Sequence, residues 1–176
     1  MRNFKFFLAA ILVLGWLLTP AFSQEDKLYT DPIEHFEFQL PANWQAVDQA
    51  EANGGRKLEF VFRGHGDDGQ FRIRKGELEK KSLDDFMKTD ELATIRYLPG
   101  FIAVKHEEPF GGGSLEGKMI EFTFKRYNSP AEGRYYYLTD GKGTVWKLEF
   151  SGRPNFIRGL RPETDRMARS FKPATK

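Results

Sequence analysis

The chain has 176 residues, enough for one domain with a hydrophobic core, and a formal net charge of +2. This small charge gives no support for nucleic-acid binding. The chain contains no cysteine, which excludes disulfides, thiol chemistry and a lipoprotein anchor.

Residues 1–23 have the layout of a secretory signal peptide. Two bases, Arg2 and Lys5, precede an apolar run that ends before Pro20, and Ala21-Phe22-Ser23 forms a small-x-small cleavage site. We expect cleavage after this site and export to the periplasm or the extracellular space. An uncleaved signal that remains as a membrane anchor is the alternative. No later stretch approaches the ~20 apolar residues that span a bilayer.

Alternation of apolar and polar residues dominates residues 24–176, which we interpret as a single domain. In the first such stretch Phe36, Phe38 and Leu40 alternate with polar residues. A period of two indicates strands with one buried face, and one-sided alternation favours antiparallel pairing. Strands are predicted near residues 34–40, 44–48, 56–64, 70–78, 101–107, 115–127, 133–139 and 144–152.

Two segments have a helical pattern, residues 82–98 and residues 162–171. Ser82 can cap the first of these helices, and Pro99-Gly100 ends it. Pro162 suits the first turn of the second helix. Together the patterns predict an α+β fold, with an antiparallel sheet and flanking helices.

The inward strand positions are mostly phenylalanine, so we expect an aromatic core. Tyr135-Tyr136-Tyr137 lies in one of the predicted strands. If the two outer rings face the core, Tyr136 points outward, either as a contact for a binding partner or as a packed cross-strand aromatic.

Three polar motifs invite a chemical interpretation. Residues 112–119 have the spacing of a phosphate-binding loop, but Met119 replaces the Ser or Thr that holds magnesium and leads into a strand, so a turn is predicted. His65, Asp67 and Asp68 share a glycine-rich loop and are weak candidates for metal ligands. The third motif, His106-Glu107-Glu108, resembles half a metal site but fits a polar strand end. No motif of a nucleophile, histidine and acid stands out, and we expect neither a catalytic residue nor a cofactor.

The two ends of residues 24–176 differ in charge. Residues 24–53 carry seven acids and one base, whereas residues 153–176 carry seven bases and two acids. Either the two ends lie close together and neutralise each other, or the basic end is a docking surface. On the second interpretation the docking candidates are Arg158, Arg161 and Arg169, together with Tyr136.

The order of these segments resembles the family of PsbP, the extrinsic lumenal subunit of photosystem II, and its bacterial DcrB-like relatives. The similar segments are Phe36 to Trp44 with its Pro-x-x-Trp ending, the glycine turn before Ile120 to Phe124, the last hairpin, and the closing Met167-Ala168-Arg169-Ser170-Phe171. The resemblance implies an α-β-α sandwich and an accessory role, and it transfers no catalytic residue.

Three hypotheses follow for function. The first is an exported, non-enzymatic accessory protein, monomeric, that binds a membrane-protein or envelope partner. The second is a periplasmic protein that binds a small ligand or a metal ion. The third is an uncharacterised hydrolase. A cleft with converging polar groups would favour the second or third hypothesis, and a face without one would favour the first.

Overall fold

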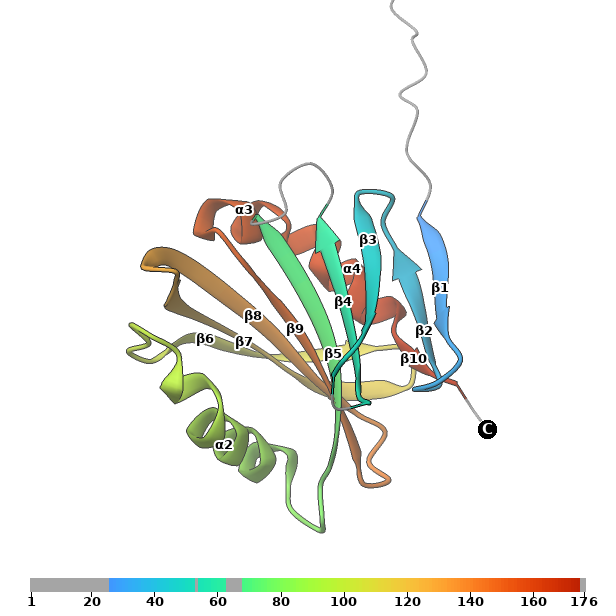
Figure 1. Cartoon of the computed structure of the whole chain (residues 1–176). Coiled ribbons are helices and arrows are strands. Elements are labelled where there is room, and N and C mark those ends of the chain that lie inside the picture. The colour runs from blue at the N-terminus through green and yellow to red at the C-terminus, as the bar shows by residue number, and fades with distance from the viewer. Residues whose placement is uncertain (1–25, 53, 63–67, 175–176) are drawn as a thin grey trace, which may run out of the picture.

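The computed structural model describes residues 26–52, 54–62 and 68–174 (Figure 1). The predicted signal peptide, His65 and Asp67 lie outside the described residues. The elements are β1 (Lys27–Asp31), β2 (Phe36–Leu40), β3 (Trp44–Ala50), β4 (Arg56–Phe62), β5 (Gly69–Glu77), α2 (Leu83–Ala93), the 3₁₀ turn η1 (Ile95–Tyr97), β6 (Val104–Gly112), β7 (Leu115–Arg126), β8 (Ser129–Thr139), β9 (Thr144–Gly152), α3 (Pro154–Gly159), α4 (Arg161–Ser170) and β10 (Lys172–Pro173).

The strands form two antiparallel sheets, so the predicted α+β class and antiparallel pairing are confirmed. The larger sheet has the order β3-β4-β5-β9-β8-β7-β6, and the smaller has the order β1-β2-β10. The alternation pattern did not predict β1, β10 or the short helix α3. The predicted helix 82–98 ends earlier, at Ala93, and η1 follows it. As predicted, Ser82 is its cap, since the Ser82 side chain accepts a hydrogen bond from the Asp85 backbone at 3.1 Å.

Helices lie against both faces of the large sheet. Met87 of α2 packs with Ile120 and Phe122 of β7, so α2 covers one face near β7 and β8. Met167 and Ala168 of α4 pack with Tyr136 of β8 on the other face, and the small sheet lies against the same side (Figure 1). These layers form the expected α-β-α arrangement, with β1, β2 and β10 added on one side.

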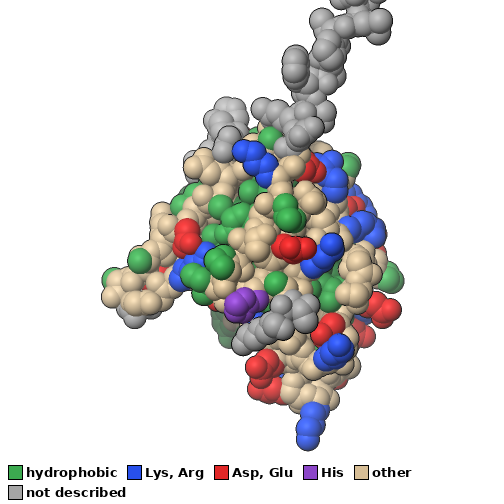
Figure 2. Space-filling view, turned by 90° about the vertical axis from the view of Figure 1, so that its right-hand side faces the viewer, with side chains coloured by type: hydrophobic (Ala, Val, Ile, Leu, Met, Phe, Trp, Pro, Cys, Tyr) green, Lys and Arg blue, Asp and Glu red, His purple; other side chains and the backbone are tan. Residues whose placement is uncertain are grey.

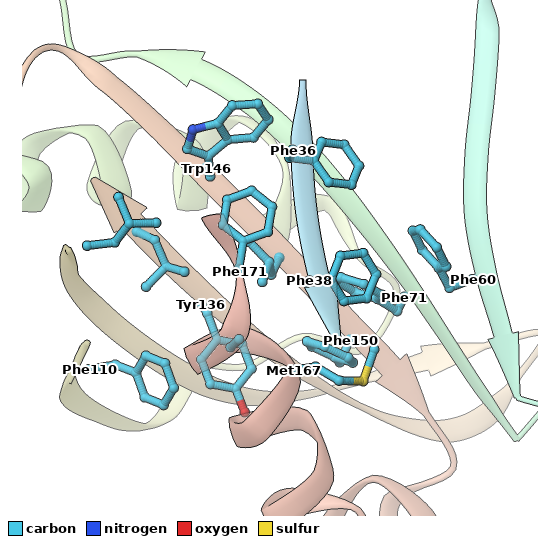
Figure 3. Packing of buried hydrophobic residues seen from close by; sticks show 14 of the residues in the cluster. Phe36, Phe38, Phe60, Phe71, Phe110, Tyr136, Trp146, Phe150, Met167 and Phe171 are labelled. Atoms are coloured by element: carbon cyan, nitrogen blue, oxygen red, sulfur yellow. The ribbon is translucent and has the colours of Figure 1, made fainter. Parts of the chain in front are cut away.

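The core under α4 and the small sheet is built from aromatic rings, as predicted. The ring of Phe71 stacks on that of Phe150 with centroids 4.2 Å apart. Phe38 of β2 meets Phe71 edge to face at 5.5 Å, which joins the two sheets (Figure 3). Phe171, just after α4, lies 5.3 Å from Trp146 (Figure 3). The strand rows and the chain end therefore meet in one cluster.

The interpretation of the large sheet as one-sided is wrong. Phe122 is fully buried, but its row packs under α2, on the face opposite to that of Phe150. In β8 the burial is two-sided: Tyr137 belongs to the α2 core and Tyr136 to the α4 core. Two apolar rows on different strands had been assigned to one face, because alternation gives the period of a strand but not which face it presents.

The charged residues of the sheet pair with one another across strands. On the α2 side, Arg72 pairs with Glu59, and Lys147 lies 2.6 Å from Glu149. On the α4 side, the buried Arg134 pairs with Glu121 of the adjacent strand. The helix α2 covers only part of its face. Lys147 and Glu149 are buried, and Lys147 also pairs with Asp90 of α2 at 2.9 Å, whereas the pair of Arg72 and Glu59 lies on the more open part of the face.

Candidate interaction surface

Tyr136, expected to point away from its two neighbours as either a docking contact or a packed aromatic, does lie on the face opposite to Tyr137 but is fully buried there, as the second alternative requires. Its ring packs edge to face on Phe110 at 4.6 Å. Its hydroxyl donates to Asp165 at 2.6 Å and lies 2.9 Å from the Thr164 hydroxyl. Burial raises the pKa of Tyr136, and the hydrogen bond to Asp165 adds to the shift. Tyr136 is therefore a packed aromatic and does not face solvent, because α4 covers the face that the sequence pattern left open.

The three candidate docking arginines already have partners within the chain. Arg158 lies 3.3 Å from Glu132, and Arg161 lies 2.7 Å from Glu108. Arg169 lies over the Phe110 ring, with its guanidinium carbon 4.5 Å from the ring centroid, and donates to the Gly111 carbonyl. Docking through these arginines remains a proposal, and it would have to compete with these intramolecular contacts.

The charges at the two ends of the described chain neutralise each other in part. Arg166 lies 3.0 Å from Asp26, and Lys172 lies 3.9 Å from Glu37. Over the face that carries β1 and β2, basic, acidic and hydrophobic side chains are interspersed (Figure 2). That face therefore has no large field of one sign.

Of the weak metal candidates His65, Asp67 and Asp68, only Asp68 belongs to the described part of the chain. Asp68 is buried and forms an ion pair with Arg153. His106 lies 3.0 Å from Glu108, whereas Glu107 pairs with Lys118. Among the described residues no group of three His, Cys, Asp or Glu side chains could hold a metal ion.

The glycine motif at residues 112–119 is a hairpin turn, as predicted. Gly112 pairs with Leu115, so Gly113 and Ser114 form a two-residue connection between β6 and β7. Gly113 has φ +60°, which glycine adopts without strain. No helix follows the motif, since Leu115 begins β7 directly.

A groove of about 440 Å³ lies on the α2 side of the sheet. Phe124 and Tyr135 of the adjacent strands β7 and β8 line its apolar part, with Leu98 from the segment after η1. The Lys125 backbone donates to the Pro99 carbonyl at 2.5 Å and ties that segment to β7. The groove is therefore built on paired strands and a fixed loop.

Tyr127, at the tip of the β7–β8 hairpin, forms one end of this groove. Arg126 pairs with Ser129, so Tyr127 and Asn128 are the two central turn residues, with φ +50° and +64°. Both values fit a type I′ turn, which favours glycine or asparagine over a bulky aromatic residue. The Tyr127 side chain is nevertheless 93% exposed. Such an unfavourable placement of an exposed ring motivates a functional explanation.

Two more exposed apolar residues belong to the segment that borders the groove. Tyr97 is 80% exposed and Ile102 is 89% exposed. Their neighbours in the chain, Leu98 and Phe101, pack against the α2 core instead. We call Tyr97, Leu98, Ile102 and Tyr127 the apolar rim. Exposed apolar side chains that gather beside a groove are typical of protein interaction sites.

The groove beside the apolar rim carries excess positive charge. Arg72, Lys125 and Arg126 line it, with Glu149 as the carboxylate among its lining residues. Arg126 also donates to the Ser151 hydroxyl at 2.6 Å, which fixes its position. Burial raises the pKa of the Tyr135 hydroxyl, so this lining group is neutral at physiological pH. The surface therefore suits an apolar segment flanked by acidic groups.

Sequence reasoning missed this surface. Ile102 lay in a predicted strand, within the apolar run of residues 101–104, so nothing in the sequence indicated that it is exposed. A signal was present at residues 127–129, because Tyr-Asn-Ser directly after a strand places an aromatic residue in a turn. The grouping of Tyr127 with Tyr97 and Ile102 depends on the tertiary fold and could not be read from the chain.

Comparison with solved structures identifies the class of fold. Models of known protein families give no match, and neither does the set of curated proteins. The solution structure of cyanobacterial PsbP (CyanoP) from Synechocystis sp. PCC 6803 is similar at TM-score 0.60 and 17% identity, over 85% of this chain and 93% of that one. LpqN, described as involved in cell envelope biogenesis of Mycobacterium tuberculosis, is similar at TM-score 0.57 and 8% identity, over 86% and 91%.

A third similar structure is PA94 from Pseudomonas aeruginosa, a protein of unknown function, at TM-score 0.57 and 13% identity, over 86% of this chain and 99% of that one. The chain is thus an α+β protein of the same architecture as these three. Its fold is PsbP-like, as the resemblance in sequence implied. Within residues 26–52, 54–62 and 68–174, no helix combines the length and apolar content that crossing a bilayer requires.

Proposed function

We propose that this chain is an exported, non-enzymatic accessory protein that binds a protein partner in the cell envelope through the apolar rim and its groove. The observation that carries the proposal is Tyr127, a ring held in solvent by a left-handed turn. The PsbP-like fold and the signal-peptide pattern of residues 1–23 support it. The partner segment that fits this surface is apolar, with acidic residues on its flanks.

Site-specific photocross-linking in the native host tests the proposal. A photoreactive phenylalanine analogue replaces Tyr127 in one variant and Ile33 in the matched control, since Ile33 is also exposed but lies in the β1–β2 turn. We expect a discrete adduct with an envelope protein from position 127 and none from position 33. Adding Ile102→Ser to the position 127 variant should weaken the adduct at least about tenfold, given the usual cost of losing a buried apolar contact.

Two results would contradict the proposal. One is the absence of an adduct at position 127 in a folded, expressed protein, and the other is equal cross-linking from both positions. The salt dependence of binding is a further check. The basic side chains at the groove should increase the association rate at low salt, and this effect should decrease as added salt screens their charge. Export is tested separately, by the mass of the protein recovered from its host, for which we expect a first residue of Gln24.

A further inference from the structure

The large sheet is divided between β4 and β5. These strands pair only at Phe60↔Phe71 and Val61↔Gln70, beside their connecting loop, and the pairing does not continue toward Arg56 or Glu77. By contrast, β3 stays paired with β4 as far as Ala50↔Arg56, and β5 stays paired with β9 as far as Glu77↔Thr144. The strands β4 and β5 therefore separate, while β4 stays paired with β3 and β5 stays paired with β9.

A cleft of about 480 Å³ occupies the place where the strands part. Residues from both sides of the sheet line it, although side chains on opposite sides of a paired sheet do not meet. Lys57, Arg72 and Arg74 belong to the α2 side, whereas Leu58 and Ile73 belong to the aromatic core on the other side. The cleft thus joins a charged surface to the edge of an apolar core.

The cleft is lined by five bases and by two acids, Glu34 and Glu51, so positive charge is in excess, and two of the bases, Arg72 and Lys75, are not fully paired within the described residues. Arg56 is saturated, with Asp31 at 2.8 Å and Asp48 at 2.7 Å. Lys57 and Arg72 share one carboxylate, that of Glu59. The Arg72 Nε is buried and has no hydrogen-bond acceptor among the described residues, and the Oε1 of its ion-pair partner Glu59 is likewise buried without a hydrogen-bond donor. The unmet donor can take an acceptor from outside the chain, in competition with Glu59.

Lys75 is the second of these two bases. Its Nζ lies 5.3 Å from the centre of the Trp146 ring, and no carboxylate in the described ranges pairs with it. Leu58, Ile73 and Trp146 give the same cleft an apolar wall. The volume is within the usual range of ~300–1,000 Å³ for small-molecule sites, which combine apolar walls with a few polar groups.

We propose that the β4–β5 cleft binds a small organic acid. The anionic head lies against Arg72 and Lys75, and an aromatic or aliphatic body lies against Leu58, Ile73 and Trp146. A carboxylate, sulfonate or phosphate head supplies the oxygen acceptor that Arg72 Nε lacks. Arg72 lines both this cleft and the groove beside the apolar rim, whereas Lys75, Leu58, Ile73 and Trp146 line the cleft and not the groove. A Lys75 variant therefore tests the cleft independently of the envelope partner.

Binding of 2-naphthoate to the isotopically labelled full chain, followed by NMR, tests the proposal. We expect saturable shifts of the Leu58 and Ile73 amides and of the Trp146 indole N–H. Two matched probes separate the contributions: 2-naphthylmethanol keeps the rings without the charge, and sulfate keeps the charge without the rings. Each should bind at least about tenfold more weakly than 2-naphthoate, that is, with a loss of ~1.4 kcal/mol or more.

Variants locate the site. Lys75→Gln should weaken 2-naphthoate binding at least about tenfold and keep the fold, because it breaks no ion pair of the described chain. Arg72→Gln should weaken it similarly, and a thermal melt will check the loss of the Glu59 pair. Lys142→Gln, in the exposed β8–β9 turn, is the control of equal charge and should bind like the parent.

Several outcomes would overturn the inference. They are no saturable binding, equal binding of the neutral probe, unchanged affinity in a folded Lys75→Gln, or shifts confined to the groove at Phe124 and Tyr127. The last of these would mean that the aromatic probe prefers the apolar rim.

Discussion

Removal of the Glu121 carboxylate should destabilise the protein by about 3 kcal/mol, which is the lower end of the ~3–5 kcal/mol measured when one partner of a buried ion pair is deleted. Arg134 is only 1% exposed. Its Nε donates to Glu121 at 2.8 Å, and a second guanidinium nitrogen lies 2.6 Å from the same oxygen. The remaining acceptors, the Ile157 carbonyl at 3.2 Å and the Thr164 hydroxyl at 3.1 Å, are neutral.

Without Glu121, a buried guanidinium would therefore keep two neutral hydrogen bonds and lose its counter-ion. We place the cost at the lower end because the Glu121 side chain is 17% exposed, so water can reach part of the vacated space. This expectation reverses the one that follows from a one-sided sheet, in which Glu121 faces solvent and Glu121→Ala costs under about 1 kcal/mol.

Urea melts of Glu121→Ala and of Glu116→Ala measure the difference. Glu116 lies on the same strand but is exposed, so its loss should cost within about 0.5 kcal/mol. The double variant Glu121→Leu/Arg134→Met should recover much of the loss, because a buried ion pair can be replaced by apolar groups of similar volume. A cost of Glu121→Ala as small as that of Glu116→Ala would refute the buried pair, and so would strictly additive losses in the double variant.

Three further predictions concern the core, the basic end and a buried acid. Phe122→Ala should lower the free energy of unfolding by about 3–5 kcal/mol in urea melts, because it leaves a cavity in place of a fully buried ring. A loss under about 1 kcal/mol would contradict the burial of Phe122 under α2. Reversing Arg158, Arg161 and Arg169 to Glu should lower the melting temperature, since the first two arginines pair with Glu132 and Glu108, and it should leave cross-linking to the partner unchanged. Loss of cross-linking at an unchanged melting temperature would instead support docking through these arginines. Burial raises the pKa of Glu132, so the folded state holds its proton more tightly than the unfolded state and stability falls as pH rises from the ordinary value through the raised pKa. Urea melts from acid to neutral pH should show this fall in the parent and not in Glu132→Gln, and parallel profiles would count against it.

The sequence predicted the strands well where polar or charged residues separate the apolar ones. The rows that contain Phe60, Phe71 and Phe150 largely have this pattern, and all three rings meet in the α4 core. The PsbP-like order of segments also led to the right fold. In β8 the strand was predicted, but the burial of both Tyr136 and Tyr137 was not. A strand with apolar residues on both faces has no alternation that would show which side chains are exposed.

The functional surfaces were less predictable, for a physical reason. The groove brings together Leu98 and Tyr127 from two segments, and the β4–β5 cleft depends on where a ladder stops. The pattern of neighbouring residues in the sequence does not determine how close two loops lie or how far two strands stay paired. The candidate docking arginines show the opposite case. In the sequence they belong to a segment with excess positive charge, but in the fold Arg161 and Arg158 pair with Glu108 and Glu132 from distant strands.

The short ladder between β4 and β5 has a consequence for the motions of this protein. The β3–β4 hairpin is joined to the rest of the large sheet by two residue pairs, and its other ties are side-chain contacts such as Trp44 to Glu163 and Arg56 to Asp31. The outer end of the hairpin, around Arg56, lacks ladder bonds to β5, whereas Trp44 and Phe60 hold its inner end in the aromatic core. The amide hydrogens of the outer end should therefore exchange with solvent through local opening, well before those of β8, which are released only by global unfolding. The large sheet thus consists of five strands with long ladders and a two-stranded hairpin whose attachment weakens toward its outer end.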